Sequence, residues 1–366
     1  MLRKNAKRIV IALLLPAGAI LFYSLSLMPV LVEYFYSNGM AKFFISALSI
    51  LTGAIPVSVA ELALILLLAI FIWYIAYTVA HAIRQKENRR KFVTRFFLNL
   101  FSAASIVYFL FIVTWGLNYN RLPFSEAAGL DTRPSEVSEL AQVCEALIVK
   151  ANSLRNEVRE NSQGIMYLPE GYEEAFRRAH KGFDNASVLY PQLGGSYGRP
   201  KGILLSRLMS YSGLTGVYFP FTAEANVNTD IPHAFILSTA CHEMAHQRGY
   251  AREDEANYVS YLVCTMNPDP DFRYSGTLLA VVNSMNALFR NDRESFNRLY
   301  ALYSEGVIRD LRYSNEYWRQ FEGPVQEVAD SINDTYLKAN LQKDGVKSYG
   351  RMVDLLIAQY RKDGLK

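Results

Sequence analysis

His242 and His246 flank Glu243 in the sequence His-Glu-Met-Ala-His, which is an H-E-x-x-H motif. If the segment is helical, positions i and i+4 lie on one face, so both imidazoles can reach a single metal ion. Glu243 then lies beside the same site, where its carboxylate can act as general base toward a metal-activated water. The motif therefore predicts the centre of a metal-dependent hydrolase.

The flanking sequence predicts the helix that the motif needs. An apolar stripe at helical spacing lies beside the histidines. Its members are Ile236, Leu237, Ala240, Cys241, Met244 and Ala245. Gly249 follows, where a helix commonly ends with a residue in the left-handed conformation.

A zinc ion needs a third protein ligand and keeps a fourth position for water. Arg252 stands where the metzincin pattern has its last histidine, and arginine does not ligate metals, so that class is excluded. Residues 253–257, Glu-Asp-Glu-Ala-Asn, resemble the E-x-x-A-N pattern of gluzincin peptidases, although gluzincins place a longer stretch before it. The resemblance implies Glu253 as third ligand, with Glu255 as the alternative and Asn257 hydrogen-bonded to a ligand. The predicted site is a Zn²⁺ ion on His242, His246 and Glu253, with Glu243 as the base.

Other polar residues are weaker candidates for a role in the site. Gluzincins usually add a Tyr, His or Arg that stabilises the oxyanion. The candidates for that role are His233, Tyr250 and Tyr274, which the sequence does not rank. Glu224, Asn226 and Asn228 form a further polar group that is predicted to make either substrate or structural contacts. The three cysteines, Cys144, Cys241 and Cys264, have no metal-ligand spacing and are predicted to be buried apolar residues.

Charge and apolar residues divide the chain near residue 116. Residues 1–116 hold eleven Lys and Arg against three Asp and Glu, whereas the whole chain has a net charge of +4, so the remainder is acidic. The basic residues are therefore no argument for nucleic-acid binding. Apolar runs predict three membrane spans, at about 9–28, 57–83 and 96–116, and an interfacial segment at 40–56. The basic N-terminus and the basic 84–95 loop place those ends in the cytoplasm and the domain 117–366 outside it.

The domain 117–366 is predicted to be a mainly helical, α+β domain of the zincin type. Pro134 is expected in the first turn of a helix, residues 203–228 alternate like short strands, and a turn-rich break lies at 194–200. Further helices are predicted at Glu170–Lys181, Leu278–Phe289, Arg293–Leu311, Val325–Asn340 and Tyr349–Tyr360.

The chain as a whole resembles an uncharacterised bacterial family of membrane-anchored H-E-x-x-H proteins, catalogued as a domain of unknown function. The resemblance rests on the three spans, the Asn-Tyr-Asn-Arg exit at 118–121, the segment 220–228 and the extended motif 242–257. It implies a multi-pass protein of the bacterial cell membrane, and the gluzincin resemblance adds zinc-dependent hydrolysis of a peptide or protein outside the cytoplasm.

Two alternatives stay open. Intramembrane cleavage would need the motif inside an apolar span, whereas charged residues flank it. A membrane-anchored binding or assembly factor with a structural or vestigial metal site is the non-enzymatic alternative. Structural zinc prefers four protein ligands, which the sequence does not offer.

Overall fold

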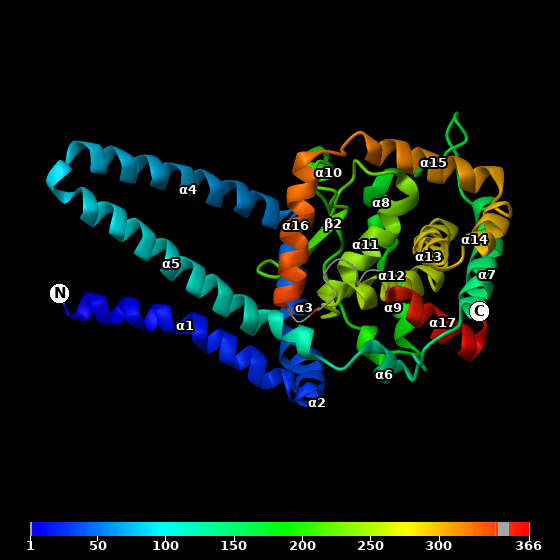
Figure 1. Ribbon diagram of the computed structural model, residues 1–366, viewed down its shortest axis with the longest axis horizontal. Helices are drawn as coiled ribbons and strands as arrows, with labels where there is room; N and C mark the ends of the chain where they lie inside the picture. Colours follow the sequence, from blue (N-terminus) through cyan, green and yellow to red (C-terminus); the bar gives the residue numbers. More distant parts are fainter. Residues whose placement is uncertain (1, 341, 343–350, 366) are drawn as a thin grey trace.

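The computed structural model describes residues 2–340, 342 and 351–365. Three long helices extend to one side of a mainly helical domain (Figure 1). They are α1 (Leu2–Ser26), α4 (Val59–Arg84) and α5 (Arg89–Thr114), and the 3₁₀ turn η2 (Lys86–Asn88) joins the last two. The three predicted spans therefore coincide with long apolar helices.

Length and composition identify the helices that could cross a membrane. Among the described residues, Val59–Arg84 and Lys86–Thr114 are long and apolar enough. A third is reached if Val10–Ser26 and Pro29–Gly53, which are bent by 102° relative to each other, count as one span.

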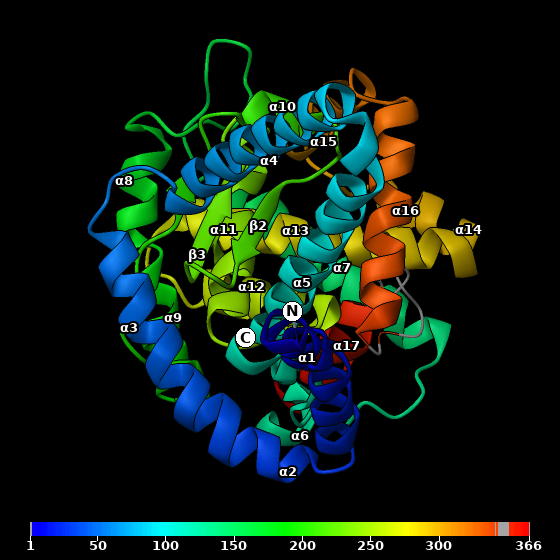
Figure 2. The same ribbon diagram turned by 90° about the vertical axis from the view of Figure 1, so that its left-hand side faces the viewer.

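The bend after α1 leads into helices that lie across the long helices. α2 (Pro29–Leu31), the π-helix η1 (Val32–Ala41) and α3 (Lys42–Gly53) follow one another along one edge of the domain (Figure 2). α3 packs tightly on the loop that follows the 3₁₀ turn η4 (Pro191–Leu193), because a Cβ on Gly198 would collide with the Ser49 carbonyl. The segment 40–56 is thus a helix held against the domain for most of its length.

Two buried carboxylates join α4 to the domain. Glu224 accepts hydrogen bonds from the backbone amides of Val59 (3.0 Å) and Ala60 (2.7 Å) in the first turn of α4. Glu61 accepts from the amides of Leu204 (2.9 Å) and Leu205 (2.8 Å). Glu61 therefore satisfies two backbone donors of the domain.

The domain is built around α13 (Pro270–Asn291). This helix contacts α7 (Val137–Arg155), the motif helix α11 (His233–Gln247), α12 (Glu253–Thr265) and α17 (Met352–Asp363). The remaining elements are η3 (Gly116–Asn120), α6 (Phe124–Ala128), α8 (Gly171–Arg178), α9 (His180–Ser187), η4 (Pro191–Leu193), α14 (Arg293–Tyr300), α15 (Glu305–Arg319) and α16 (Pro324–Ala339). All three cysteines are free and buried in this core, as predicted.

A small sheet lies beside α11. It consists of β1 (Lys201–Gly202), β2 (Gly216–Phe219) and β3 (Glu224–Val227) in the order β1-β3-β2. β1 runs parallel and β2 antiparallel to β3, with Lys201 and Val217 both opposite Asn226. The prediction of strands throughout 203–228 is wrong in part, because α10 (Ser206–Ser210) separates β1 from β2.

Two helix predictions need correction, and a third concerns residues that the structure does not describe. Pro134 precedes α7, whose N-cap is Glu136 in a capping box with Glu139. The predicted helix Arg293–Leu311 is two helices, because Ser304 caps a new helix by accepting from the Val307 amide. The predicted start of the last helix at Tyr349 falls outside the described residues.

Candidate metal centre

A tight turn brings α11 and α12 together at the motif. Gly249 has φ +81°, as its predicted position after the helix required, and its amide donates to the His246 carbonyl (2.9 Å). The Tyr250 amide donates to the Ala245 carbonyl (3.1 Å), which closes the last turn of α11. The chain then reverses and α12 begins at Glu253. The first residue of α12 therefore lies over the last two turns of α11.

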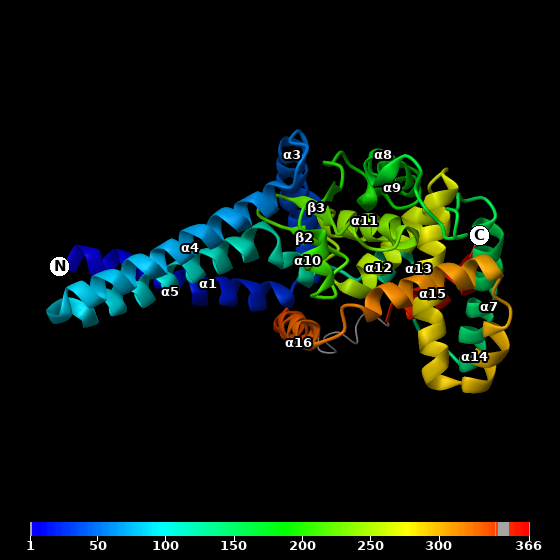
Figure 3. The same cartoon turned by 90° about the horizontal axis from the view of Figure 1, so that it is seen from above.

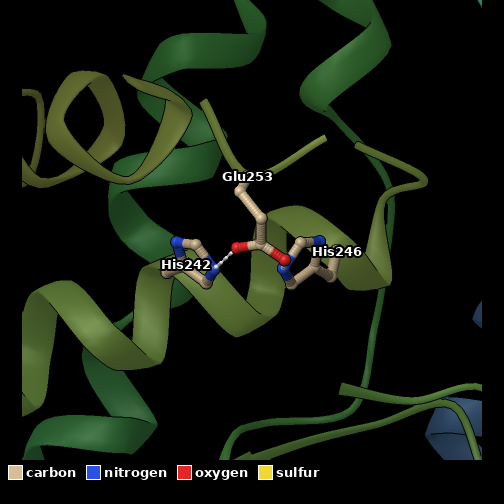
Figure 4. A group of neighbouring side chains, drawn as sticks. All are labelled: His242, His246 and Glu253. Atoms are coloured by element: carbon tan, nitrogen blue, oxygen red, sulfur yellow. Dashed lines mark ion pairs between the residues drawn. The ribbon is translucent and has the colours of Figure 1, made fainter. Parts of the chain in front are cut away.

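Glu253 lies between the two histidines (Figure 4). One of its carboxylate oxygens is 3.2 Å from His242 Nε2 and the other is 3.6 Å from His246 Nε2. Ligand atoms of the three residues all lie within 4.8 Å of one another, so this group could hold a metal ion. Hence the structure brings together the three residues that the sequence singled out as ligands.

Each imidazole is oriented through its other nitrogen. His242 Nδ1 lies 2.9 Å from Asn257 Oδ1, and His246 Nδ1 lies 2.7 Å from the Tyr250 carbonyl oxygen. Both partners are acceptors, so each Nδ1 carries a proton and Nε2 is the atom that each imidazole turns toward the shared site. The hydrogen bond predicted for Asn257 is present.

Burial and opposite charge set the ionisation of the group. Burial raises the pKa of Glu253, but the imidazoles of His246 and His242 lower it more, so this pKa ends below its ordinary range. Burial lowers the pKa of His246, but the Glu253 carboxylate raises it by more, so that this pKa ends at about 9. Without a metal, the cluster therefore holds a proton on His246 against an ionised Glu253.

Glu243 is buried beside the ligands. Burial raises the pKa of its carboxyl to about 6, although His242 and His246 lower it in part. A hydrogen bond from the Tyr218 backbone amide also lowers this pKa. Gly216 leaves room for the carboxylate, because a Cβ there would collide with it. Strand β2 thus runs directly beside Glu243, and a carboxylate with this pKa is suited to accept a proton near neutral pH.

Glu255, the alternative ligand, points into the protein. One of its oxygens accepts a hydrogen bond from the Phe124 amide (2.8 Å), and Arg252 lies 3.5 Å from the same oxygen. Since Glu253 and Glu255 are two positions apart on a helix, only one of them can face the histidines. The structure places Glu253 there.

The three residues considered for oxyanion stabilisation make other contacts. His233 Nδ1 accepts from the Leu168 amide, and it begins α11, nine residues before His242. The Tyr250 ring lies under the Arg121 guanidinium, and the Tyr274 hydroxyl donates to Asp310. All three are therefore held in the fold rather than aimed at the ligands.

The polar group on and after β3 is structural. Glu224 pairs with Lys201 and caps α4, Asn226 donates to the Glu224 carbonyl, and Asn228 donates to Ser210 and to the Leu214 carbonyl. Of the two roles predicted for these residues, the structural one agrees with their contacts.

Two aromatic residues near the three candidate ligands were not predicted from the sequence. The Trp115 indole donates to the His246 carbonyl (3.2 Å), and its ring centroid is 6.1 Å from that of His246. Tyr336 on α16 bonds to the Tyr119 hydroxyl (3.1 Å). Burial raises the pKa of Tyr336 to about 12, an increase to which the Glu253 carboxylate contributes. Tyr336 lies 83 positions beyond Glu253 and carries no motif, so no local pattern could have identified it.

A protein-family model described as "Protein of unknown function (DUF3810)" matches residues 36–357. The chain therefore belongs to this family, in agreement with the resemblance to an uncharacterised family. No curated protein and no solved structure matches the chain.

Proposed function

We propose that this member of the DUF3810 family is a membrane-anchored, zinc-dependent peptidase with His242, His246 and Glu253 as ligands. One observation carries the proposal: three donor atoms converge, and a separate acceptor orients each imidazole. The gluzincin resemblance of the 253–257 segment supports the same assignment, because there too the third ligand opens a second helix.

The donor set fits zinc. Tetrahedral coordination at about 2.0–2.1 Å places neighbouring ligand atoms about 3.3 Å apart. One Glu253 oxygen lies 3.2 Å from His242 Nε2, close to that value, and the other oxygen lies 3.6 Å from His246 Nε2. A bound zinc ion supplies Lewis acidity, which polarises a carbonyl group and acidifies water.

The chain's own groups account for the remaining steps. Glu243 takes a proton from the attacking water and returns it to the departing amine. Strand β2 offers its outer edge to an extended peptide, since among the described residues it pairs with β3 alone. The Tyr336 hydroxyl can donate to the carbonyl oxygen as negative charge develops there.

The same proposal places the site at a membrane. The long helices cross the bilayer, their basic ends lie in the cytoplasm, and the catalytic domain lies on the other side. The alternative of a binding factor with a structural metal would have the same topology.

Purified full-length protein should bind one zinc ion and cleave a quenched-fluorescent peptide library. In Glu243→Gln, the zinc should stay while the rate falls by about 10²–10⁴-fold, because an amide cannot accept the proton. Glu157→Gln, a surface carboxylate paired with Arg273, serves as matched control and should keep full activity. Zinc binding without any hydrolysis by the unaltered protein would favour the binding factor.

A further inference from the structure

Aromatic side chains at the end of α5 contact β2 and His246 on one side of the candidate site and α16 on the other. The Trp115 ring, one residue beyond α5, lies 5.3 Å from the Tyr218 ring on β2 as well as 6.1 Å from His246. On the other side, the Phe111 ring lies 6.4 Å from the Tyr336 ring on α16. Since α5 is one of the apolar helices, the metal ligands lie within a few ångströms of the end of a membrane span.

An apolar layer surrounds this end of the domain. α3 and α16 lie across the long helices where these meet the domain, with α10 nearby (Figures 1 and 3). Large apolar side chains are exposed here, among them Phe43 and Leu51 on α3 and Leu204 and Leu208 around α10. Exposed apolar residues in one layer at the ends of apolar helices indicate contact with a bilayer.

α16 has the most regular apolar face of this layer. Val325, Val328, Ile332 and Tyr336 follow one another at spacings of three and four, so they share one side of the helix. Their exposed fractions are 59, 59, 65 and 41 %. A second side carries Leu337, which is fully buried against the domain. The third side holds charged residues, namely Glu327, Asp334 and Lys338.

The occupant of this apolar face is the bilayer. Its last member, Tyr336, contacts the half-buried Phe111 near the end of α5, so this apolar face adjoins the point where a span meets the domain. A helix with an apolar side, a charged side and a position at the span ends is of the kind that lies in the interface plane.

We propose that the substrates are polypeptides anchored in the same bilayer, which reach the site along the membrane surface between β2 and α16. This inference rests on the proposed peptidase function. An extended chain advances about 3.3 Å per residue, so the bond that is cut lies within about five residues of the end of the substrate's own span. A soluble peptide lacks the anchor that concentrates it at this depth.

The full-length chain in phosphatidylethanolamine–phosphatidylglycerol nanodiscs would be given three peptide libraries with the same randomised ten-residue segment. In the first library, two residues separate the randomised segment from a membrane span. In the second library, fifteen residues separate them, and the third library has no span. Cleavage followed by mass spectrometry should be at least tenfold faster with the short tether than with the other two, and absent in Glu243→Gln.

Matched variants test the role of α16. Ile332→Asp puts a charge on the apolar face and should reduce the preference for the short tether about tenfold. Ser331→Asp adds the same charge one position away, on the exposed polar side, and should leave the preference unchanged. Equal or faster cleavage of the soluble library overturns this inference alone, whereas no cleavage of any library by the zinc-loaded protein overturns the proposed function with it.

A measurement independent of activity examines the bilayer contact. Spin labels at Ile332→Cys and Ser331→Cys can be introduced selectively, because the native cysteines are buried. Collisions with oxygen should dominate at 332, and collisions with a water-soluble nickel complex should dominate at 331, on the exposed polar side of the helix. Nickel-dominated collisions at both positions would exclude α16 from the bilayer.

Discussion

Glu253 and Glu255 show how two identical side chains on one helix acquire different partners. The first opens α12 and faces the imidazoles, whereas the second faces the interior and accepts the Phe124 amide. The different surroundings separate a proposed metal ligand from a structural carboxylate, and each can be altered on its own.

Glu255→Ala should destabilise the domain without removing the metal. It leaves the buried Phe124 amide without its acceptor, and such a loss costs about 1–3 kcal/mol. The free energy of unfolding in denaturant should fall by that amount, while zinc titration stays unchanged. Loss of zinc from this variant, with retention in Glu253→Ala, would mean that the ligand assignment is reversed.

Asn257→Ala should weaken zinc binding about tenfold, because the imidazole of His242 loses the acceptor that orients it. Competition with a fluorescent chelator measures the affinity. Asn283→Ala is the matched control, since the side-chain amide of Asn283 donates to the Leu279 carbonyl within its own helix α13. Equal affinities in both variants would show that Asn257 has no part in orienting the ligand.

At the scale of helices and strands, local signals in the sequence were the reliable ones. The spacing of His242 and His246, the position of Gly249 and the register of Glu253 and Asn257 all lie within sixteen residues. They could be predicted because helix geometry alone relates them. Boundaries were less certain, as Pro134 and Ser304 show, because one hydrogen bond decides where a helix begins.

Contacts between distant segments could not be predicted. Glu61 bonds to amides more than 140 positions away. Tyr336 comes near Glu253 from a helix that the sequence predicted without indicating its neighbours. The sequence contains the partners, but only the packing of the whole domain determines that they meet. The zinc itself and the reaction stay predictions.

The contact between α7 and α17 should depend on pH. Arg361 bonds to Glu139 (2.7 Å) and lowers the pKa of that carboxyl to about 2. Because the pKa is lower in the folded state, the pair stabilises the fold above about pH 4.5, and this contribution disappears as the pH falls toward 2. The thermal midpoint of Glu139→Gln should therefore lie below that of the unaltered protein at pH 7 and converge with it near pH 2. Glu145→Gln on the same helix should show no such convergence.

For the whole molecule, the charge distribution makes a prediction about orientation. A phosphatase reporter fused after Trp115 should be active, since that enzyme folds only outside the cytoplasm, and one fused at Arg90 should be inactive. A fluorescent protein that matures only in the cytoplasm should give the opposite pattern. Activity of the phosphatase at Arg90 would reverse the orientation and place the metal ligands in the cytoplasm.

The attachment of α4 by Glu224 has a consequence for assembly during synthesis. The amides of Val59 and Ala60 leave the ribosome about 165 residues before the carboxylate that accepts them. If α4 crosses the bilayer as proposed, it inserts with its first turn solvated, and it exchanges water for Glu224 only when β3 has been made. Contacts of such sequence separation form late and slowly. A chain lacking this carboxylate would consequently be inserted normally but would fail at the final step, the docking of the finished domain onto its own anchor.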